Sequence, residues 1–122
     1  MGIISLLIYR HYSTKYGVDV PSDTEIEGGL KFAHCQNIVI TEKAVIGENC
    51  TIFQGVTIGC NIIGDQQGPT IGKNVTICAG AKIIGNISIG NNVIIGANAV
   101  VVKNMPNNCV AVGVPAKVIR VI

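Results

Sequence analysis

The sequence predicts an all-β protein in which short strands and tight turns coil into one regular solenoid. Three observations indicate this fold: isoleucines recur at six-residue intervals, Gly and Asn recur between them, and aromatic residues are scarce. The 122 residues are 48% apolar but only 4% aromatic, and they include 15 Gly. A core built from Ile, Val and Ala is therefore expected, and a chain of this length fits a single domain.

The six-residue repeat is most regular between residues 71 and 106. One apolar column contains Ile71, Ile77, Ile83, Ile89, Ile95 and Val101, and the second contains Val75, Ala81, Ile87, Val93, Ala99 and Met105. The same frame begins upstream at Ile40, and a looser version begins at Val20. A helix would need apolar residues three and four positions apart, and a long strand would need strict alternation. Each unit is therefore a short strand with a turn, and coils stacked about 4.8 Å apart share one core.

A helix is predicted for residues 1–16, ahead of the solenoid at 17–122. Its apolar residues have helix-face spacing, and Gly17 supplies a stop signal; these residues are Ile4, Leu7, Ile8 and Tyr12. A solenoid leaves a free strand edge at its first coil. We therefore expect this helix to cap that coil.

Two segments interrupt the repeat, and the function of a regular scaffold usually lies where it is interrupted. Residues 32–39 (FAHCQNIV) form a unit of eight and contain His34, the one His within the repeats. Residues 59–70 (GCNIIGDQQGPT) do not continue the columns and predict an excursion loop. Both segments are candidates for a functional site.

Composition argues against several classes of function. The net charge is +2 and no dense Lys/Arg cluster occurs, so a nucleic-acid partner is not expected. The five Cys form no CxxC pair and no secretory start precedes them, which predicts reduced thiols and a cytoplasmic protein. The first apolar run is too short to span a membrane, and membrane contact is not expected. With His11 and His34 alone, a three-His zinc site is not expected, and we predict no metal.

Residues 17–119 resemble the hexapeptide-repeat acyltransferases, in particular the serine acetyltransferases and the related sugar O-acetyltransferases. The resemblance rests on the stretch VDVPSDTEIEGGLKFAHCQNIVITEKAVIGENCTIFQGVTIG and on the closing AVGVPAKVI. It implies a left-handed parallel β-helix. The handedness comes from the resemblance alone, because ordinary parallel crossovers are right-handed. It also implies a homotrimer with active sites between subunits.

The same resemblance implies the catalytic residues: His34 matches the general base, and Asp19 matches the carboxylate that orients it. A neutral imidazole can accept the proton of a hydroxyl that attacks the thioester of acetyl-CoA. Main-chain N–H groups near Gly59 and Cys60 are expected to stabilise the oxyanion. The separation of Asp19 and His34 is not a whole turn of the solenoid, so their pairing rests on the family. Cys35 is not expected to be a nucleophile, because neighbouring strand residues face opposite sides.

The resemblance also implies that acetyl-CoA lies along the seam between neighbouring subunits. The small residues that match this seam are Ala79, Gly80 and Ala97, and the cations that suit the phosphates are Lys103, Lys117 and Arg120. Alternatively, the small residues serve only the turns, and the cations are solvated terminal charges.

The excursion loop is expected to bind the acceptor. Serine acetyltransferases have an Arg-His pair before the proline that returns to the β-helix, whereas Gln67 and Gly68 precede Pro69 here. A carboxylate would lack a cationic partner. Asp65, Gln66 and Gln67 suit hydrogen bonding to a sugar, so we expect a hydroxyl of a polysaccharide or its precursor, with serine as the alternative acceptor. Two further hypotheses are a loop that only contacts a neighbouring subunit and a chain that is a non-catalytic trimeric scaffold.

Overall fold

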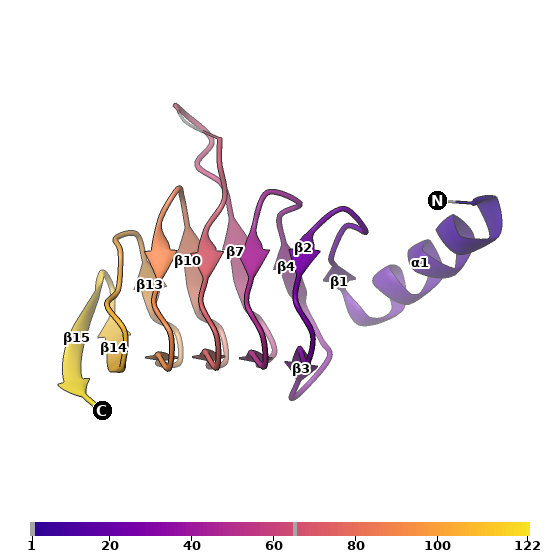
Figure 1. Cartoon of the computed structure of the whole chain (residues 1–122). Coiled ribbons are helices and arrows are strands. Elements are labelled where there is room, and N and C mark those ends of the chain that lie inside the picture. Colours follow the sequence, from indigo (N-terminus) through magenta and orange to yellow (C-terminus); the bar gives the residue numbers. More distant parts are fainter. Residues whose placement is uncertain (1, 65) are drawn as a thin grey trace.

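The protein is a parallel β-helix preceded by one helix, as seen in a computed structural model that describes residues 2–64 and 66–122 (Figure 1). The first sheet pairs β1 (Val18–Asp19), β4 (Ile38–Ile40), β7 (Thr57–Gly59), β10 (Lys82–Ile84) and β13 (Val100–Val101) in that order. The second sheet pairs β2 (Glu25–Ile26), β5 (Val45–Ile46), β8 (Thr70–Ile71) and β11 (Ser88–Ile89). The third sheet pairs β3 (Lys31–Phe32), β6 (Thr51–Ile52), β9 (Thr76–Ile77), β12 (Ile94–Ile95), β14 (Cys109–Gly113) and β15 (Ala116–Val121).

The strand register confirms the six-residue repeat as the building unit. Ile71 pairs with Ile89, eighteen positions later, so three units of six complete one coil of the prism. Both predicted apolar columns point inward. Their side chains are 0 to 2% exposed except for Met105 at 7% and the half-buried Ile87. Strands pair in parallel throughout, except that β15 folds back antiparallel on β14.

Both predicted interruptions lie at turns. The first interruption adds two residues to a turn. Phe32 and Ile38 are six positions apart, whereas the residues stacked on them in the next coil, Ile52 and Val56, are four positions apart. The excursion projects from the prism between β7 and β8 (Figure 1). Its predicted ends, residues 59 and 70, belong to these strands, so the described irregular residues are 60–64 and 66–69.

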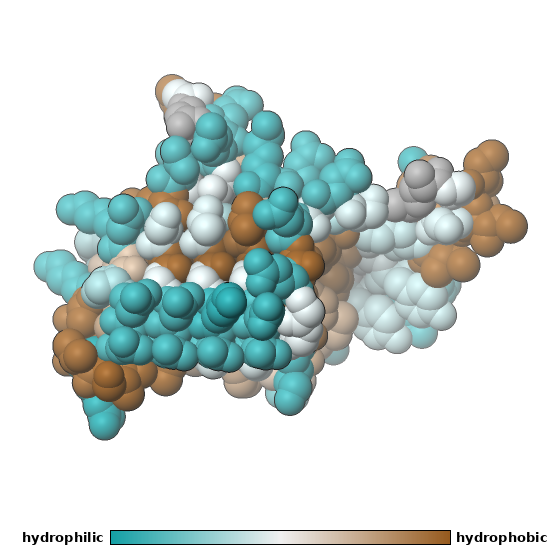
Figure 2. Space-filling model, viewed as in Figure 1, coloured by the Kyte–Doolittle hydropathy of each residue, from teal (hydrophilic) through white to brown (hydrophobic). Residues whose placement is uncertain are grey.

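Asparagines form one corner of the prism, where the second sheet turns into the third. They adopt left-handed backbone conformations with φ of 56 to 59°, which Asn tolerates better than other residues with a side chain; these are Asn49, Asn74, Asn92 and Asn108. Asn92 Nδ2 donates to Asn108 Oδ1 at 3.1 Å, from one coil to the next. Figure 2 shows hydrophilic residues in rows along the β-helix, outside the apolar core.

Helix α1 (Ile3–Tyr16) ends where the sequence predicts. Gly17 adopts the left-handed conformation (φ 66°), and its N–H donates to Ser13 O at 2.7 Å. The helix contacts β1, but no α1 side chain described by the structure is buried, and Ile3 and Ile4 are 79% and 75% exposed. In Figure 1 it extends away from the β-helix. The expected cap is therefore only partial.

An apolar cleft of about 220 Å³ separates the helix from the first coil, with Tyr12 and Tyr16 on one side and Val20 and Phe32 on the other. Within the described ranges, no helix has both the length and the apolar character needed to cross a membrane.

Candidate functional site

One corner of the prism carries most of the predicted site. We call it the histidine corner: the turns 33–37, 53–56, 78–81 and 96–99, each of which leads from the third sheet to the first. Main-chain hydrogen bonds stack these turns. Gly55 N donates to Gln36 O at 3.1 Å, Gly80 N to Gln54 O at 2.9 Å, and Asn98 N to Ala79 O at 2.9 Å. These bonds place Ala79, Gly80 and Ala97 in one row, and His34 belongs to the first turn of the stack, two positions before Gln36.

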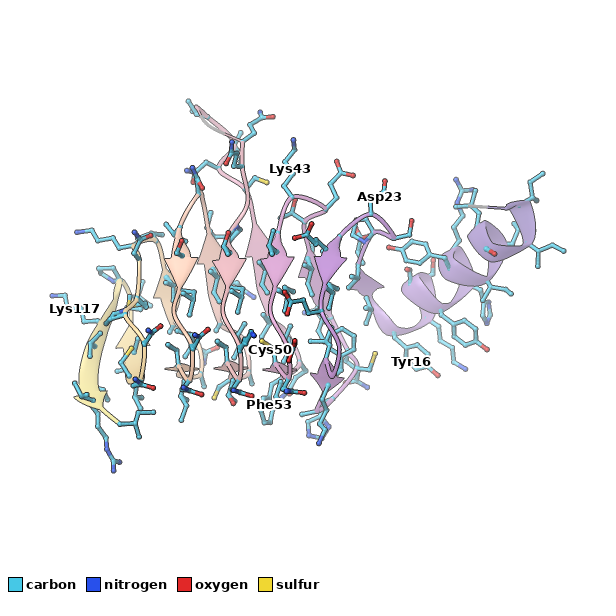
Figure 3. All side chains as sticks on the ribbon, in the orientation of Figure 1. Tyr16, Asp23, Lys43, Cys50, Phe53 and Lys117 are labelled. Atoms are coloured by element: carbon cyan, nitrogen blue, oxygen red, sulfur yellow. The ribbon has the colours of Figure 1, made fainter. Side chains whose placement is uncertain are left out.

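His34 lies at the start of this row and is exposed. Its ring centroid is 6.4 Å from that of Phe53, with the ring planes tilted by 53°. Figure 3 labels Phe53 at the base of the prism, one coil after His34. The exposed position suits a base that must meet an external hydroxyl, and the Phe53 ring provides an apolar wall on one side of the imidazole.

Asp19 does not contact His34 in the structure. It lies on the outer side of β1, and its Oδ1 accepts a hydrogen bond of 2.6 Å from the hydroxyl of Tyr9 on α1. Burial and the bond to Asp19 raise the pKa of Tyr9, so the phenol remains a donor at neutral pH. The turn at Gly17 joins α1 directly to β1, and the two elements contact each other, which explains why the carboxylate meets the helix. The expected pairing of Asp19 with His34 remains a prediction.

Gly59 and Cys60 lie at a different corner, where the first sheet turns into the second. Gly59 O accepts from Gly85 N at 2.9 Å, and Cys60 Sγ lies 3.3 Å from Thr41 Oγ1. The three residues of β7 separate this corner from the histidine corner, a span of about 10 Å at roughly 3.3 Å per residue. Main-chain donors at Gly59 and Cys60 therefore do not face His34 of the same chain.

The three predicted cations are spread over the C-terminal coils. Lys103 follows β13, on the same corner as Cys60, and is exposed. Lys117 pairs with Val112, whose side chain lies beside Gly96, so this hairpin follows the last turn of the histidine corner. Arg120 pairs with Val110 further along β15. Of these cations, Lys117 is the one at the end of the histidine corner.

The excursion loop holds the predicted acceptor residues. Gln66 and Gln67 are exposed, while Asp65 lies outside the described residues. Gly68 is buried, and a Cβ added there would come within 2.7 Å of the main chain of Lys43. A histidine at position 68, as in the pair of the serine acetyltransferases, would therefore require the backbone to move.

A cleft of about 470 Å³ lies beside the base of the loop. Its wall is formed by Ile84 of β10 and by residues at the start of the excursion, including Ile62 and Ile63, which are 92% and 88% exposed. Among the residues that the structure describes, no group of three or more His, Cys, Asp or Glu is placed to hold a metal ion.

Three residues of interest are not among the sequence predictions: Tyr9, Phe53 and Gln54. Gln54 is half-buried, and its Oε1 is fully buried without a hydrogen-bond partner. The sequence carries a signal for the last two, because a Phe and a Gln occupy turn positions where later units have Cys78 and Ala79. No comparable signal points to Tyr9, whose role depends on how the helix packs.

Comparisons with known proteins agree with this architecture. The bacterial transferase hexapeptide family (six repeats) matches residues 68–103. The serine acetyltransferase of Synechococcus elongatus is 43% identical over 106 residues, which cover 84% of this chain and 43% of that relative. The chain thus spans about half the length of the curated relatives it matches.

Solved structures show the same similarity. A serine acetyltransferase in complex with CoA is 40% identical with a TM-score of 0.82, and the match covers 94% of this chain and 48% of the other. The Neisseria gonorrhoeae serine acetyltransferase in complex with serine is 44% identical with a TM-score of 0.81, covering 88% and 44%. This chain therefore belongs to the hexapeptide-repeat transferase family, and its fold is the left-handed parallel β-helix expected from the sequence.

Proposed function

We propose that this chain is an acetyl-CoA-dependent O-acetyltransferase in which His34 is the general base. The observation that carries the proposal is the stack of turns on the histidine corner, which begins at the turn of His34, continues through those of Ala79 and Ala97 and ends at the hairpin of Lys117. Five strand spacings of about 4.8 Å separate β3 from β15, so this row is about 24 Å long. Such a row suits an extended ligand with its reactive end at His34 and its phosphates at the cation.

Charge along the chain supports this orientation. All seven acidic residues lie between Asp19 and Asp65, whereas residues 66–122 contain five of the nine cations and no acid. The coils around the far end of the histidine corner are therefore positive. Phosphate groups are attracted to unopposed Lys and Arg side chains, whereas the first coils, which hold the acids, would repel them.

In the proposed reaction, the imidazole of His34 accepts the proton of the acceptor hydroxyl while the oxygen attacks the thioester carbonyl. The C–O bond forms and the carbonyl oxygen becomes a tetrahedral oxyanion. When the intermediate collapses, the C–S bond breaks and the imidazolium returns the proton to the sulfur. The products are the O-acetyl ester and free CoA, and the imidazole is neutral again.

We further propose a homotrimer with sites between subunits. Gly59 and Cys60 lie about 10 Å from the histidine corner of their own chain, so these donors would reach the oxyanion from a neighbouring copy. All five cysteines are free, which fits the reducing cytoplasm that we expect for this enzyme.

Serine is the acceptor that we propose first. It is supported by the relatives, which are named serine acetyltransferases, and by the solved structure of one of them in complex with serine. The comparisons do not support the polysaccharide acceptor preferred from the sequence. A sugar hydroxyl remains the second candidate for one reason: Gln67 and Gly68 stand in place of the cationic pair, and the main chain of Lys43 leaves Gly68 no room for a side chain.

The test is release of CoA thiol from acetyl-CoA in the presence of serine or of a panel of sugars and nucleotide sugars. We expect serine to give the highest kcat/KM, with release far above the rate without acceptor. Faster turnover of a sugar would make the sugar the acceptor. A chain that releases no thiol with any acceptor, and whose unfolding temperature CoA does not change, would be the non-catalytic scaffold instead.

A further inference from the structure

The side chain of Gln54 has an unusual position within the histidine corner. Its Oε1 is fully buried and has no hydrogen-bond partner in the structure. Such an orphaned acceptor is unfavourable, because burial removes the water with which it would otherwise pair. A buried acceptor without a partner is one of the few features of a ligand-free protein that point to a donor on a ligand.

The place of Gln54 in the row shows which ligand would approach it. The turn of Gln54 is stacked on the turn of His34 through the bond from Gly55 N to Gln36 O. On its other side, Gln54 O accepts a hydrogen bond from Gly80 N, so the turn that contains Ala79 is stacked next to the turn of Gln54. Gln54 therefore lies between the proposed base and the small residues of the proposed cofactor seam.

Side-chain size along the row supports the same conclusion. The next two turns have only a methyl group at the corresponding position, at Ala79 and Ala97. Among these three stacked positions, Gln54 is the one that can make a side-chain hydrogen bond. An arm lying on Ala79 and Ala97 would pass this acceptor immediately before it reaches His34.

We propose that Gln54 Oε1 accepts a hydrogen bond from the amide N–H of the acyl-CoA arm that lies nearest the thioester. The pantetheine arm of acyl-CoA carries two secondary amides, and each has one N–H donor. The bond would fix the thioester carbonyl beside His34 and at the same time pair the buried oxygen. This inference rests on the proposed function, because it assumes that acyl-CoA occupies the histidine corner.

The test compares Gln54→Met with Gln66→Met by calorimetric titration of CoA and by thermal unfolding. Methionine has a similar volume to glutamine but lacks the amide acceptor. Gln66 is an exposed glutamine of the excursion loop, away from the histidine corner, so its variant is the matched control for CoA binding. We expect Gln54→Met to raise the Kd for CoA about ten-fold and Gln66→Met to leave it unchanged. The unfolding temperature of the CoA-free Gln54→Met protein should be equal to or above that of the wild type, because an orphaned acceptor has been removed.

A second measurement identifies the amide. S-acetyl-N-acetylcysteamine keeps the amide nearest the thioester and lacks the second one. We expect Gln54→Met to lower kcat/KM with this thioester by a factor similar to that seen with acetyl-CoA. An undiminished kcat/KM would overturn the assignment to the nearer amide.

Further outcomes separate this inference from the proposed function. Wild-type protein that binds CoA, together with a Gln54→Met variant that binds it equally well, would overturn the role of Gln54 alone. A variant that loses affinity only in proportion to a lowered unfolding temperature would assign Gln54 a structural role. Wild-type protein that binds no CoA would overturn both the proposed function and this inference.

Discussion

The two neighbouring isoleucines of β12 provide a sharp test of the repeat register. Ile95 is 0% exposed and belongs to the first apolar column, whereas Ile94 points outward and is 38% exposed. The same change, Ile to Ala, can therefore be made on both faces of one two-residue strand. The composition of the chain changes identically in the two variants, so only the burial differs.

The structure sets the expected magnitudes. An Ile95→Ala change removes three buried carbon groups at about 0.8 kcal/mol each, or about 2.4 kcal/mol. The cavity left in a closely packed core raises the total to about 3–4 kcal/mol. At Ile94 about three fifths of the side chain is buried, so the change loses about three fifths of the transfer energy, and solvent fills the space. The expected loss in the free energy of unfolding is therefore about 1.5 kcal/mol or less.

Urea unfolding of the two variants and the wild type, followed by circular dichroism at one protein concentration, measures the difference. We expect Ile95→Ala to lower the free energy of unfolding by about 2 kcal/mol more than Ile94→Ala. Equal losses, or a larger loss at Ile94, would refute the assignment of the columns to the interior and with it the order of the stacked turns.

Three further predictions concern backbone conformation, thiol ionisation and the role of Asp19. Gly80→Ala should lower the free energy of unfolding by about 1–2 kcal/mol, because its φ of +75° is unfavourable for a residue with a side chain. Gly28→Ala is the control, since nothing lies within 4 Å of the added Cβ. In the same urea titration it should change the free energy of unfolding by less than about 0.5 kcal/mol. Burial raises the pKa of the Cys50 thiol, so its contribution to stability is complete below the pKa of the unfolded state and is lost as pH rises through the pKa of the folded state. Urea unfolding at successive alkaline pH values should show this decline in the free energy of unfolding. A Cys50→Ala variant whose free energy of unfolding declines equally steeply would contradict the prediction. If Asp19 orients the base, Asp19→Asn should lower kcat while Tyr9→Phe changes only thermal stability; equal effects of the two variants on kcat would show that Asp19 serves to hold α1.

Much of the fold was predictable because the repeat is a strong periodic signal. Each turn of the prism must place one residue of each column inside, so a six-residue interval specifies both the strands and the core. The two interruptions were also visible, since extra residues cannot lie in the columns and must leave at a turn. The handedness was not readable from the interval, which is the same for either hand.

The helix shows where this reasoning failed. Its end at the Gly17 stop is a local property and was predicted correctly, although the helix begins at Ile3 and not at residue 1. How far it covers the first coil depends on tertiary packing, and the apolar cleft beside Tyr12 and Tyr16 shows that coverage is incomplete. The bond between Tyr9 and Asp19 arises from the same packing, which explains why no sequence pattern indicated it.

The site was predictable in part for a related reason. Ala79 and Ala97 share a turn position, so the repeat frame aligns them. His34 lies in the longer turn between β3 and β4, and the order of the strands places it on the same corner. Gly59 and Cys60 fall at another turn position, and the structure places them on another corner. The preference for a sugar acceptor came from loop composition at Gln67 and Gly68, which says little about what the complete site binds.

The most direct test of the proposed mechanism is the acetyl-transfer rate of His34→Asn. Asparagine keeps a polar side chain of similar size but does not act as a base at neutral pH, so we expect kcat to fall by about a hundred- to ten-thousand-fold while the Kd for CoA is unchanged. A His34→Asn variant that transfers acetyl groups at the wild-type rate would contradict general-base catalysis by this residue.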